Sequence, residues 1–106
     1  VWPPERLVPV HRGDVAQTTG LAVRDYRDVP QHAITQGCVV VNCVGTPKGT
    51  PAVLGAVNQE VPIAWAHAAA AGGARAFIQL SSLSVYGLAE RIDRTTSEAP
   101  VTNYGA

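Results

Sequence analysis

Apolar residues along the chain gather in three short runs, and polar or glycine- and proline-rich stretches separate them. The run at 38–44 is almost continuously apolar and β-branched, without alternation, which is typical of a strand covered on both faces in a parallel sheet. Residues 76–80 form a second apolar run, which ends in Ser81-Ser82, and residues 7–10 form a weaker one that contains Pro9. Since proline cannot donate to a ladder, the run at 7–10 is the least regular of the three predicted strands.

Residues 52–71 predict a helix in two pieces, because Pro62 is tolerated only in a first helical turn. Gly72 and Gly73 then stop the helix. Residues 16–35 are mixed, and a short helix that turns Leu21, Val23 and Tyr26 toward a core is the interpretation here, although Gly20 and Pro30 interrupt it. The face of the longer helix that we expect to be buried consists of Val61, Trp65, Ala68 and Ala69.

A strand, a helical crossover and a second strand form a βαβ unit. With the earlier strand at 7–10, this order predicts an α/β fold, a partial Rossmann-like doubly wound parallel sheet of three strands with a crossover helix. In such sheets ligands bind beyond the carboxyl ends of the strands. Gly13-Asp14, the segment 42–46 and Ser81-Ser82 stand at these ends, so we expect them to share one crevice.

Composition excludes several classes of function. The chain has 106 residues, 46% hydrophobic and 15% charged, with eight basic residues against eight acidic ones. This balance favours neither nucleic acid nor an anionic membrane, and no apolar run approaches the roughly 20 residues of a membrane span. A cytoplasmic protein is therefore expected. The three histidines show no metal-ligand spacing, and Cys38 and Cys43 are predicted to be buried free thiols without a mutual disulfide.

Two segments near the end of the chain carry a more specific signal. Ser81-Ser82-Leu83-Ser84-Val85-Tyr86-Gly87 follows the third strand, and Ser97-Glu98-Ala99-Pro100 precedes Tyr104-Gly105-Ala106. This pattern of S-S-x-x-V-Y-G, an acidic segment with proline, and Y-G-A resembles the extended short-chain dehydrogenase/reductase family of NAD-dependent epimerases and dehydratases. The resemblance covers essentially the whole chain.

The resemblance implies a cofactor, NAD or NADP, and a small-molecule substrate such as a nucleotide sugar. It implies Ser82 and Tyr104 as catalytic residues, with Ser82 and Ser84 contacting substrate. A homodimeric parent protein is compatible with it. Asn58 matches the family's helix asparagine, although Val61 and Pro62 replace the glycine and threonine that follow in the family. The positions that it implies for cofactor binding are Asp14, Val15, Cys43, Val44, Gly45, Asn58, Leu80 and Ser81.

Elementary chemistry is consistent with these roles. Hydride transfer from a sugar carbon requires removal of the proton on the adjoining hydroxyl, and a phenol acts as the base only if a nearby positive charge stabilises the phenolate. In the family, a lysine four residues after the tyrosine supplies this charge. A serine hydroxyl can hold the substrate oxygen as donor or acceptor.

Two departures from the family matter. No glycine-rich phosphate loop is present, and the family's lysine would fall two positions beyond Ala106. We therefore interpret residues 1–106 as the central part of an NAD(P)-binding Rossmann domain, lacking the N-terminal glycine-rich βαβ unit and the C-terminal part. Such a fragment is expected to bind dinucleotide poorly and to be inactive alone. Leu83 and Ser84 replace the acid pair of sugar 4,6-dehydratases, which leaves an epimerase or a simple reductase.

Other interpretations stay open. Ser81 and Ser82 could cap a strand end, Asp14 could belong to a turn, Asn58 could cap a helix, and Tyr104 could be an ordinary half-buried tyrosine. From a different class, a non-catalytic, atypical dinucleotide-binding module that acts as a sensor or assembly subunit is the alternative function. A generic α/β domain without dinucleotide is the third.

Overall fold

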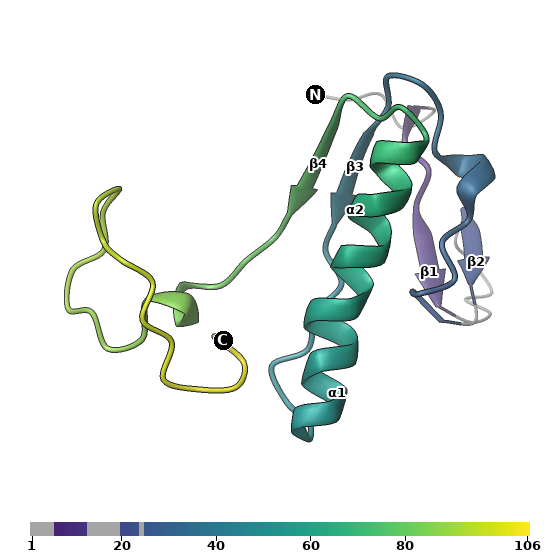
Figure 1. Ribbon diagram of the computed structural model, residues 1–106. Coiled ribbons are helices and arrows are strands. Elements are labelled where there is room, and N and C mark those ends of the chain that lie inside the picture. Colours follow the sequence, from purple (N-terminus) through teal and green to yellow (C-terminus); the bar gives the residue numbers. More distant parts are fainter. Residues whose placement is uncertain (1–5, 13–19, 24) are drawn as a thin grey trace.

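The computed structural model describes residues 6–12, 20–23 and 25–106. It contains two separate two-stranded parallel sheets (Figure 1). In the first sheet β1 (Val10–Arg12) pairs with β2 (Leu21–Val23). In the second, β3 (Val39–Asn42) pairs with β4 (Ala76–Gln79), with Val39 opposite Ala76 and Asn42 opposite Gln79. The parallel pairing of the two strands that flank the helix is as the sequence predicts.

A single long helix connects β3 to β4. It consists of α1 (Pro51–Gly55), the π-helical turn η3 (Ala56–Glu60) and α2 (Val61–Ala71), and Figure 1 shows no break between them. The predicted division into two pieces is therefore wrong. Pro62 would push its ring against the carbonyl of an α-helical turn. The π turn, in which the Val61 N–H reaches back to the Ala56 carbonyl, widens the backbone just before Pro62 and lets the helix continue.

The core lies where α2 covers one face of the β3–β4 sheet. Trp65, which is 8% exposed, and Ala68 belong to this core, and Val40 and Phe77 of the sheet pack against it. The indole N–H of Trp65 also donates a hydrogen bond of 2.6 Å to the carbonyl of Tyr26, which ties the segment before the short helix η2 (Gln31–Ala33) to α2. The predicted buried face, Val61, Trp65, Ala68 and Ala69, is confirmed.

The predicted three-stranded doubly wound sheet is wrong. β1 is hydrogen-bonded to β2 and not to β3, and the Leu21 N–H donates to the Pro9 carbonyl at 2.9 Å. Between β1 and β3 lies a hollow of about 710 Å³, and residues 6–10 and 38–44 line its two sides.

The prediction of a short helix that contains residues 21–23 is also wrong. Gly20, with φ of +144°, takes an extended left-handed conformation there that no helix contains, and the residues after it pair as a strand.

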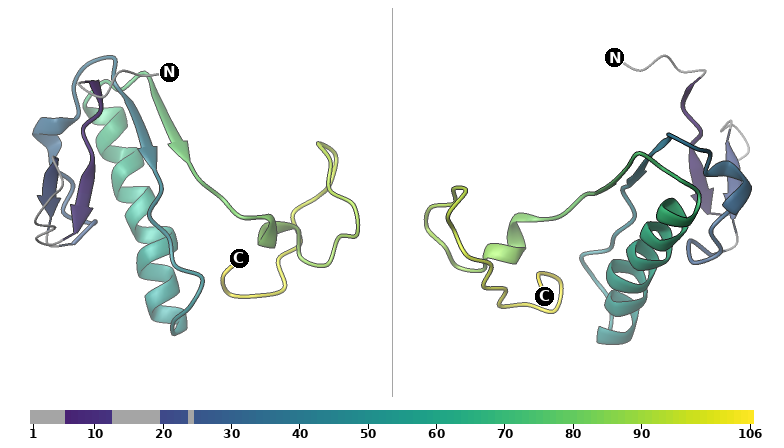
Figure 2. Two further views of the ribbon diagram at one scale, coloured as in Figure 1. Left: turned by 180° about the vertical axis from the view of Figure 1, so that it is seen from behind. Right: turned by 45° about the horizontal axis from the view of Figure 1, so that its top comes forward.

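The residues after β4 leave the helix–sheet body. They run outward as an extended link to η4 (Leu83–Tyr86) and then form a long loop that turns back toward α1 (Figures 1 and 2). The radius of gyration is 15.7 Å, against about 13 Å for a compact domain of this length. The C-terminal segment thus forms a separate arm, and it meets the body only near the start of the helix.

The two cysteine thiols are less buried than predicted. Both cysteines are free, as predicted, but Cys38 is only half-buried and Cys43 is exposed. A two-stranded sheet with a helix on one face cannot cover the end of β3, which explains the exposure of Cys43. Over the described ranges, no three His, Cys, Asp or Glu side chains come together as a metal site would require. In the same ranges, no helix combines the length and the apolar character needed to cross a membrane.

Candidate functional site

The loop after β3 is held by the side chain of Asn58. The Asn58 Oδ1 accepts a hydrogen bond of 2.8 Å from the Thr46 N–H, and the Asn58 Nδ2 donates one of 2.9 Å to the Thr46 carbonyl. A Cβ at Gly45 would stand 3.6 Å from the same Oδ1, so the loop approaches the helix closely. Asn58 lies in the π turn, and both ends of its amide are used to position this loop.

The two serines of the η4 segment contact each other. Ser82 is the N-cap of η4, and its Oγ accepts a hydrogen bond of 3.2 Å from the Ser84 N–H. The Oγ atoms of Ser82 and Ser84 are also 3.2 Å apart and form a hydrogen bond. The capping interpretation of Ser82 therefore describes its conformation in this structure, and the hydroxyl retains a second lone pair for another partner.

The end of the chain folds back on η4. Gly105 is buried and packs on the Ser84 carbonyl, and the Ala99 N–H donates to the Val85 carbonyl at 2.9 Å. Tyr104, which is half-buried, immediately precedes this contact. The arm thus closes into a loop whose two ends, the serine segment and the tyrosine segment, lie together.

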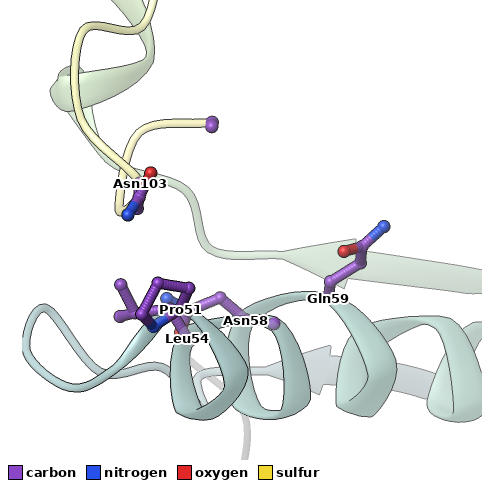
Figure 3. Close-up of a pocket in the computed structure, with 7 residues that line it drawn as sticks. Pro51, Leu54, Asn58, Gln59 and Asn103 are labelled. Carbon is purple, nitrogen blue, oxygen red and sulfur yellow. The ribbon is translucent and has the colours of Figure 1, made fainter.

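A cleft of about 360 Å³ separates this arm from the start of the helix (Figure 3). On the helix side Asn58 and Leu54 border it, and on the arm side Asn103 faces them. The volume is at the small end of the range for ligand pockets. The complete lining is Pro51, Leu54, Gly55, Asn58, Gln59, Asn103 and Ala106.

Tyr104 lies between a residue that borders the cleft and a residue that contacts the serine segment. Asn103 on one side of it lines the cleft, and Gly105 on the other side contacts Ser84. Two sequence-predicted groups, Asn58 with Gly45 and Ser82 with Ser84, therefore lie on either side of the tyrosine segment. Sequence reasoning placed these residues at one site, and the backbone brings their segments to one region.

The remaining predicted positions are less closely grouped. Leu80 and Ser81 lie in the extended link and are exposed, and Cys43 is exposed beyond β3. Val44 is half-buried, and its N–H is held by the Asn42 side chain at 3.2 Å. Asp14 and Val15 lie outside the described residues.

None of the side chains that line the cleft is charged. The strongest charge interactions lie elsewhere on the surface. Arg27 forms an ion pair of 2.8 Å with Asp25, and its hydrogen bonds lower the pKa of that carboxyl to about 2. In the arm, hydrogen bonds from Thr95 lower the pKa of Asp93. These carboxylates are fixed as anions for structural reasons and do not line the cleft.

Sequence reasoning missed several residues of the cleft. Asn103 and Gln59 provide side-chain amides, and Pro51 and Leu54 provide its apolar wall. The one available signal was adjacency, since Asn103 precedes Tyr104 and Gln59 follows Asn58. Adjacency alone does not say which neighbour faces a ligand.

No family model matches this chain, and no curated protein or solved structure matches it either.

Proposed function

We propose that this chain carries part of the active site of an NAD(P)-dependent epimerase or reductase that acts on a hydroxyl or carbonyl group, for example in a nucleotide sugar. In this proposal, which rests on the resemblance to extended short-chain dehydrogenases/reductases, Tyr104 transfers the proton and Ser82 holds the reacting oxygen. The cleft between the helix and the arm receives the ligand.

One observation carries the proposal. Tyr104 stands between Asn103, which lines the cleft opposite Asn58, and Gly105, which packs on the Ser84 carbonyl. Residues 82 and 104 are far apart in the chain, and the long excursion between them starts and ends at the same place. This meeting of the two backbone segments supports the proposal, because groups that act on one substrate oxygen must come from segments that lie together.

The lining residues fit the part of the ligand that carries no phosphate. Side-chain amides donate and accept hydrogen bonds, as a carboxamide or sugar hydroxyls require, and Pro51 and Leu54 offer an apolar wall to a ring. A pyrophosphate would need a cation or a cradle of backbone N–H groups, and no lining residue of the cleft is charged. We therefore assign the cleft to the nicotinamide–ribose or the sugar, and not to the phosphates.

The chain's own groups would then act as follows. The Ser82 hydroxyl, which donates to the Ser84 Oγ in this structure, would turn its proton to the substrate oxygen while its lone pair retains the Ser84 N–H. Tyr104 would take the proton from the substrate hydroxyl during oxidation and return it during reduction. A nicotinamide held beside Asn103 and Asn58 would supply the hydride chemistry, in which alcohol and oxidised cofactor give carbonyl, reduced cofactor and one proton. Asn58 fixes the loop at Thr46 and contributes position, not chemistry.

A specific observation favours the alternative, a non-catalytic dinucleotide-binding module. Both polar atoms of the Asn58 amide are bonded to Thr46, and the Ser82 hydroxyl caps η4. Side chains that are already satisfied can serve a purely structural role. The two functions differ in one respect, namely whether the phenolic oxygen of Tyr104 is needed for turnover.

Single-turnover kinetics tests this difference in the intact protein that contains this chain. We expect Tyr104→Phe to slow reduction of bound cofactor by about 10²-fold or more, with little change in dinucleotide affinity, because the ring remains and only the acid/base group is lost. Tyr86→Phe is the matched control, since it removes the phenol of the other tyrosine near η4. Equal rates for Tyr104→Phe and the unsubstituted protein would favour the binding module.

A further inference from the structure

A chain of side-chain amides joins the carboxyl ends of β3 and β4. The Val44 N–H donates to the Asn42 Oδ1 at 3.2 Å, and the Asn42 Nδ2 donates to the Gln79 Oε1 at 2.7 Å. The Gln79 Nε2 then donates to the Leu80 carbonyl at 2.7 Å. The three hydrogen bonds run in one direction, so each amide polarises the next.

Asn42 is an unusual residue for its position. It is 5% exposed, the one polar side chain among the buried residues of the described chain, and it follows three valines. Burying an amide without partners costs about 1–3 kcal/mol on the scale of protein substitutions. Here the cost is offset because both ends of the amide are bonded. Gln79, by contrast, is exposed, so its hydrogen bond to Asn42 is not a consequence of burial.

The amide chain has a definite mechanical consequence. Its first bond turns the backbone directly before Gly45, and its last bond holds the backbone directly before Ser81. The backbone ladder ends at the same level, where the Leu80 N–H donates to the Asn42 carbonyl at 3.1 Å. No strand of the described residues flanks the β3–β4 pair on either edge, so these ends have no other sheet neighbour to hold them together.

We propose that Asn42 and Gln79 are positioning residues. They fix the distance between the two strand ends and thereby align the Gly45–Thr46 loop, which Asn58 holds, with the link that leads to Ser82. This proposal deepens the proposed function and rests on it for its catalytic consequence, but its structural part can be measured separately.

The test is amide hydrogen exchange on the 106-residue chain. Gln79→Leu removes the central amide while keeping a similar side-chain size at an exposed position. We expect the Leu80 N–H to exchange about fivefold to tenfold faster, as for loss of one hydrogen bond, and the Arg75 N–H to be unchanged. Arg75 is the internal control, because its N–H donates to the Cys38 carbonyl at the other end of the same ladder, at 2.7 Å. Gln36→Leu is the matched control, an exposed glutamine without a hydrogen bond in the described part of the chain.

A second variant guards against a simple loss of stability. In Asn42→Gln with Gln79→Asn, the two amides exchange places and the combined side-chain length is kept, so slow exchange at Leu80 should return. Equal acceleration of exchange at the Leu80 and Arg75 amides in Gln79→Leu, or no change at either, would overturn the proposal.

In the intact protein, Gln79→Leu should slow single-turnover reduction without altering its pH profile. If Tyr104→Phe proves silent while the exchange result holds, the proposed function fails and the positioning role of the pair remains.

Discussion

Gly105 packs directly against the main-chain carbonyl group of Ser84. A Cβ added at Gly105 would lie 2.8 Å from the Ser84 carbonyl carbon, closer than real Cβ atoms approach backbone, and in tight contact with the Pro100 Cβ at 3.3 Å. The arm therefore closes only because residue 105 has no side chain. Tyr104 owes its place beside η4 to this contact.

Gly105→Ala should open the arm. The added methyl group must displace backbone, and overpacking of this kind costs about 1–3 kcal/mol. We expect the nuclear Overhauser contacts between residue 105 and Ser84 to disappear and the Tyr104 ring to become more exposed to a soluble paramagnetic probe. The β3–β4 sheet should keep its chemical shifts, because the arm meets the body only near the start of the helix.

Gly55→Ala is the matched control for that substitution. Gly55 is helical, and a Cβ there would meet nothing within 4 Å. Alanine should raise the free energy of unfolding by up to about 1 kcal/mol, since it is the better helix former. Retained contacts between residue 105 and Ser84 in Gly105→Ala would contradict the proposed closure.

The Asn58–Thr46 contact predicts a clear difference between neighbouring amides. Asn58→Leu leaves the N–H and the carbonyl of Thr46 without their partners, so we expect a loss of about 1–3 kcal/mol in the free energy of unfolding, measured by urea denaturation. Gln59→Leu, one residue later and exposed, should change that free energy by less than about 0.5 kcal/mol. Similar losses in both variants would show that Asn58 does not hold the loop.

The Asp25–Arg27 pair predicts a local pH dependence. Hydrogen bonds from the Arg27 guanidinium lower the pKa of Asp25 from 3.8 to about 2. A lowered pKa in the folded state stabilises the fold fully above pH 3.8, and this contribution is lost as the pH falls toward 2. Both side chains are about half exposed, so the effect on the free energy of unfolding should be small and sensitive to salt.

Carbon-detected titration of the Asp25 carboxyl group can measure this shift. Arg27→Gln should return the pKa of Asp25 toward 3.8, because the first and largest cause of its lowering is removed. Arg75→Gln, which changes an exposed arginine directly before β4, should leave the pKa of Asp25 unchanged. An Asp25 pKa that does not respond to Arg27→Gln would mean that the ion pair does not form in solution.

The parts of the fold that the sequence predicted are those that local pattern determines. The unbroken apolar run at 38–44 and the alanine-rich helix led to the parallel β3–β4 pair and to the buried face around Trp65. β2 was missed because three residues, Leu21–Val23, carry no distinguishable period. The partner of β1 could not be predicted either, since strand pairing depends on tertiary contacts and not on the composition of each strand.

The residues of the candidate site also fall into two groups, those that a local sequence pattern identifies and those that only the fold brings together. Ser82 and Tyr104 could be named because they belong to a spaced motif, and Asn58 because it lies on the helix at a matching place. The roles of Asn42, Gln79 and Asn103 depend on bonds or packing between segments distant in sequence. A buried asparagine after three valines was visible in the sequence, but its partner Gln79 became evident only from the register of the two strands.

The two roles of Ser82, helix cap and substrate contact, can be separated by substitution. Replacing an N-cap serine by glycine lowers the free energy of unfolding by only a few tenths of a kcal/mol, whereas it removes the hydroxyl entirely. Ser82→Gly in the intact protein should therefore retain its thermal midpoint within a few degrees and lose about 10²-fold in kcat. Ser82→Asp should cap η4 as well as serine does, because its carboxylate can accept a hydrogen bond from the Ser84 N–H. The carboxylate cannot donate to a substrate oxygen, so we expect a similar loss of kcat.

Thr50→Gly is the matched control, since the Thr50 hydroxyl caps α1 by accepting from the Val53 N–H at 3.3 Å and takes no part in the proposed chemistry. Its thermal midpoint should fall as slightly as that of Ser82→Gly while its kcat stays at the level of the unsubstituted protein. Unchanged kcat in Ser82→Gly would reduce Ser82 to a cap and leave Tyr104 without its proposed partner.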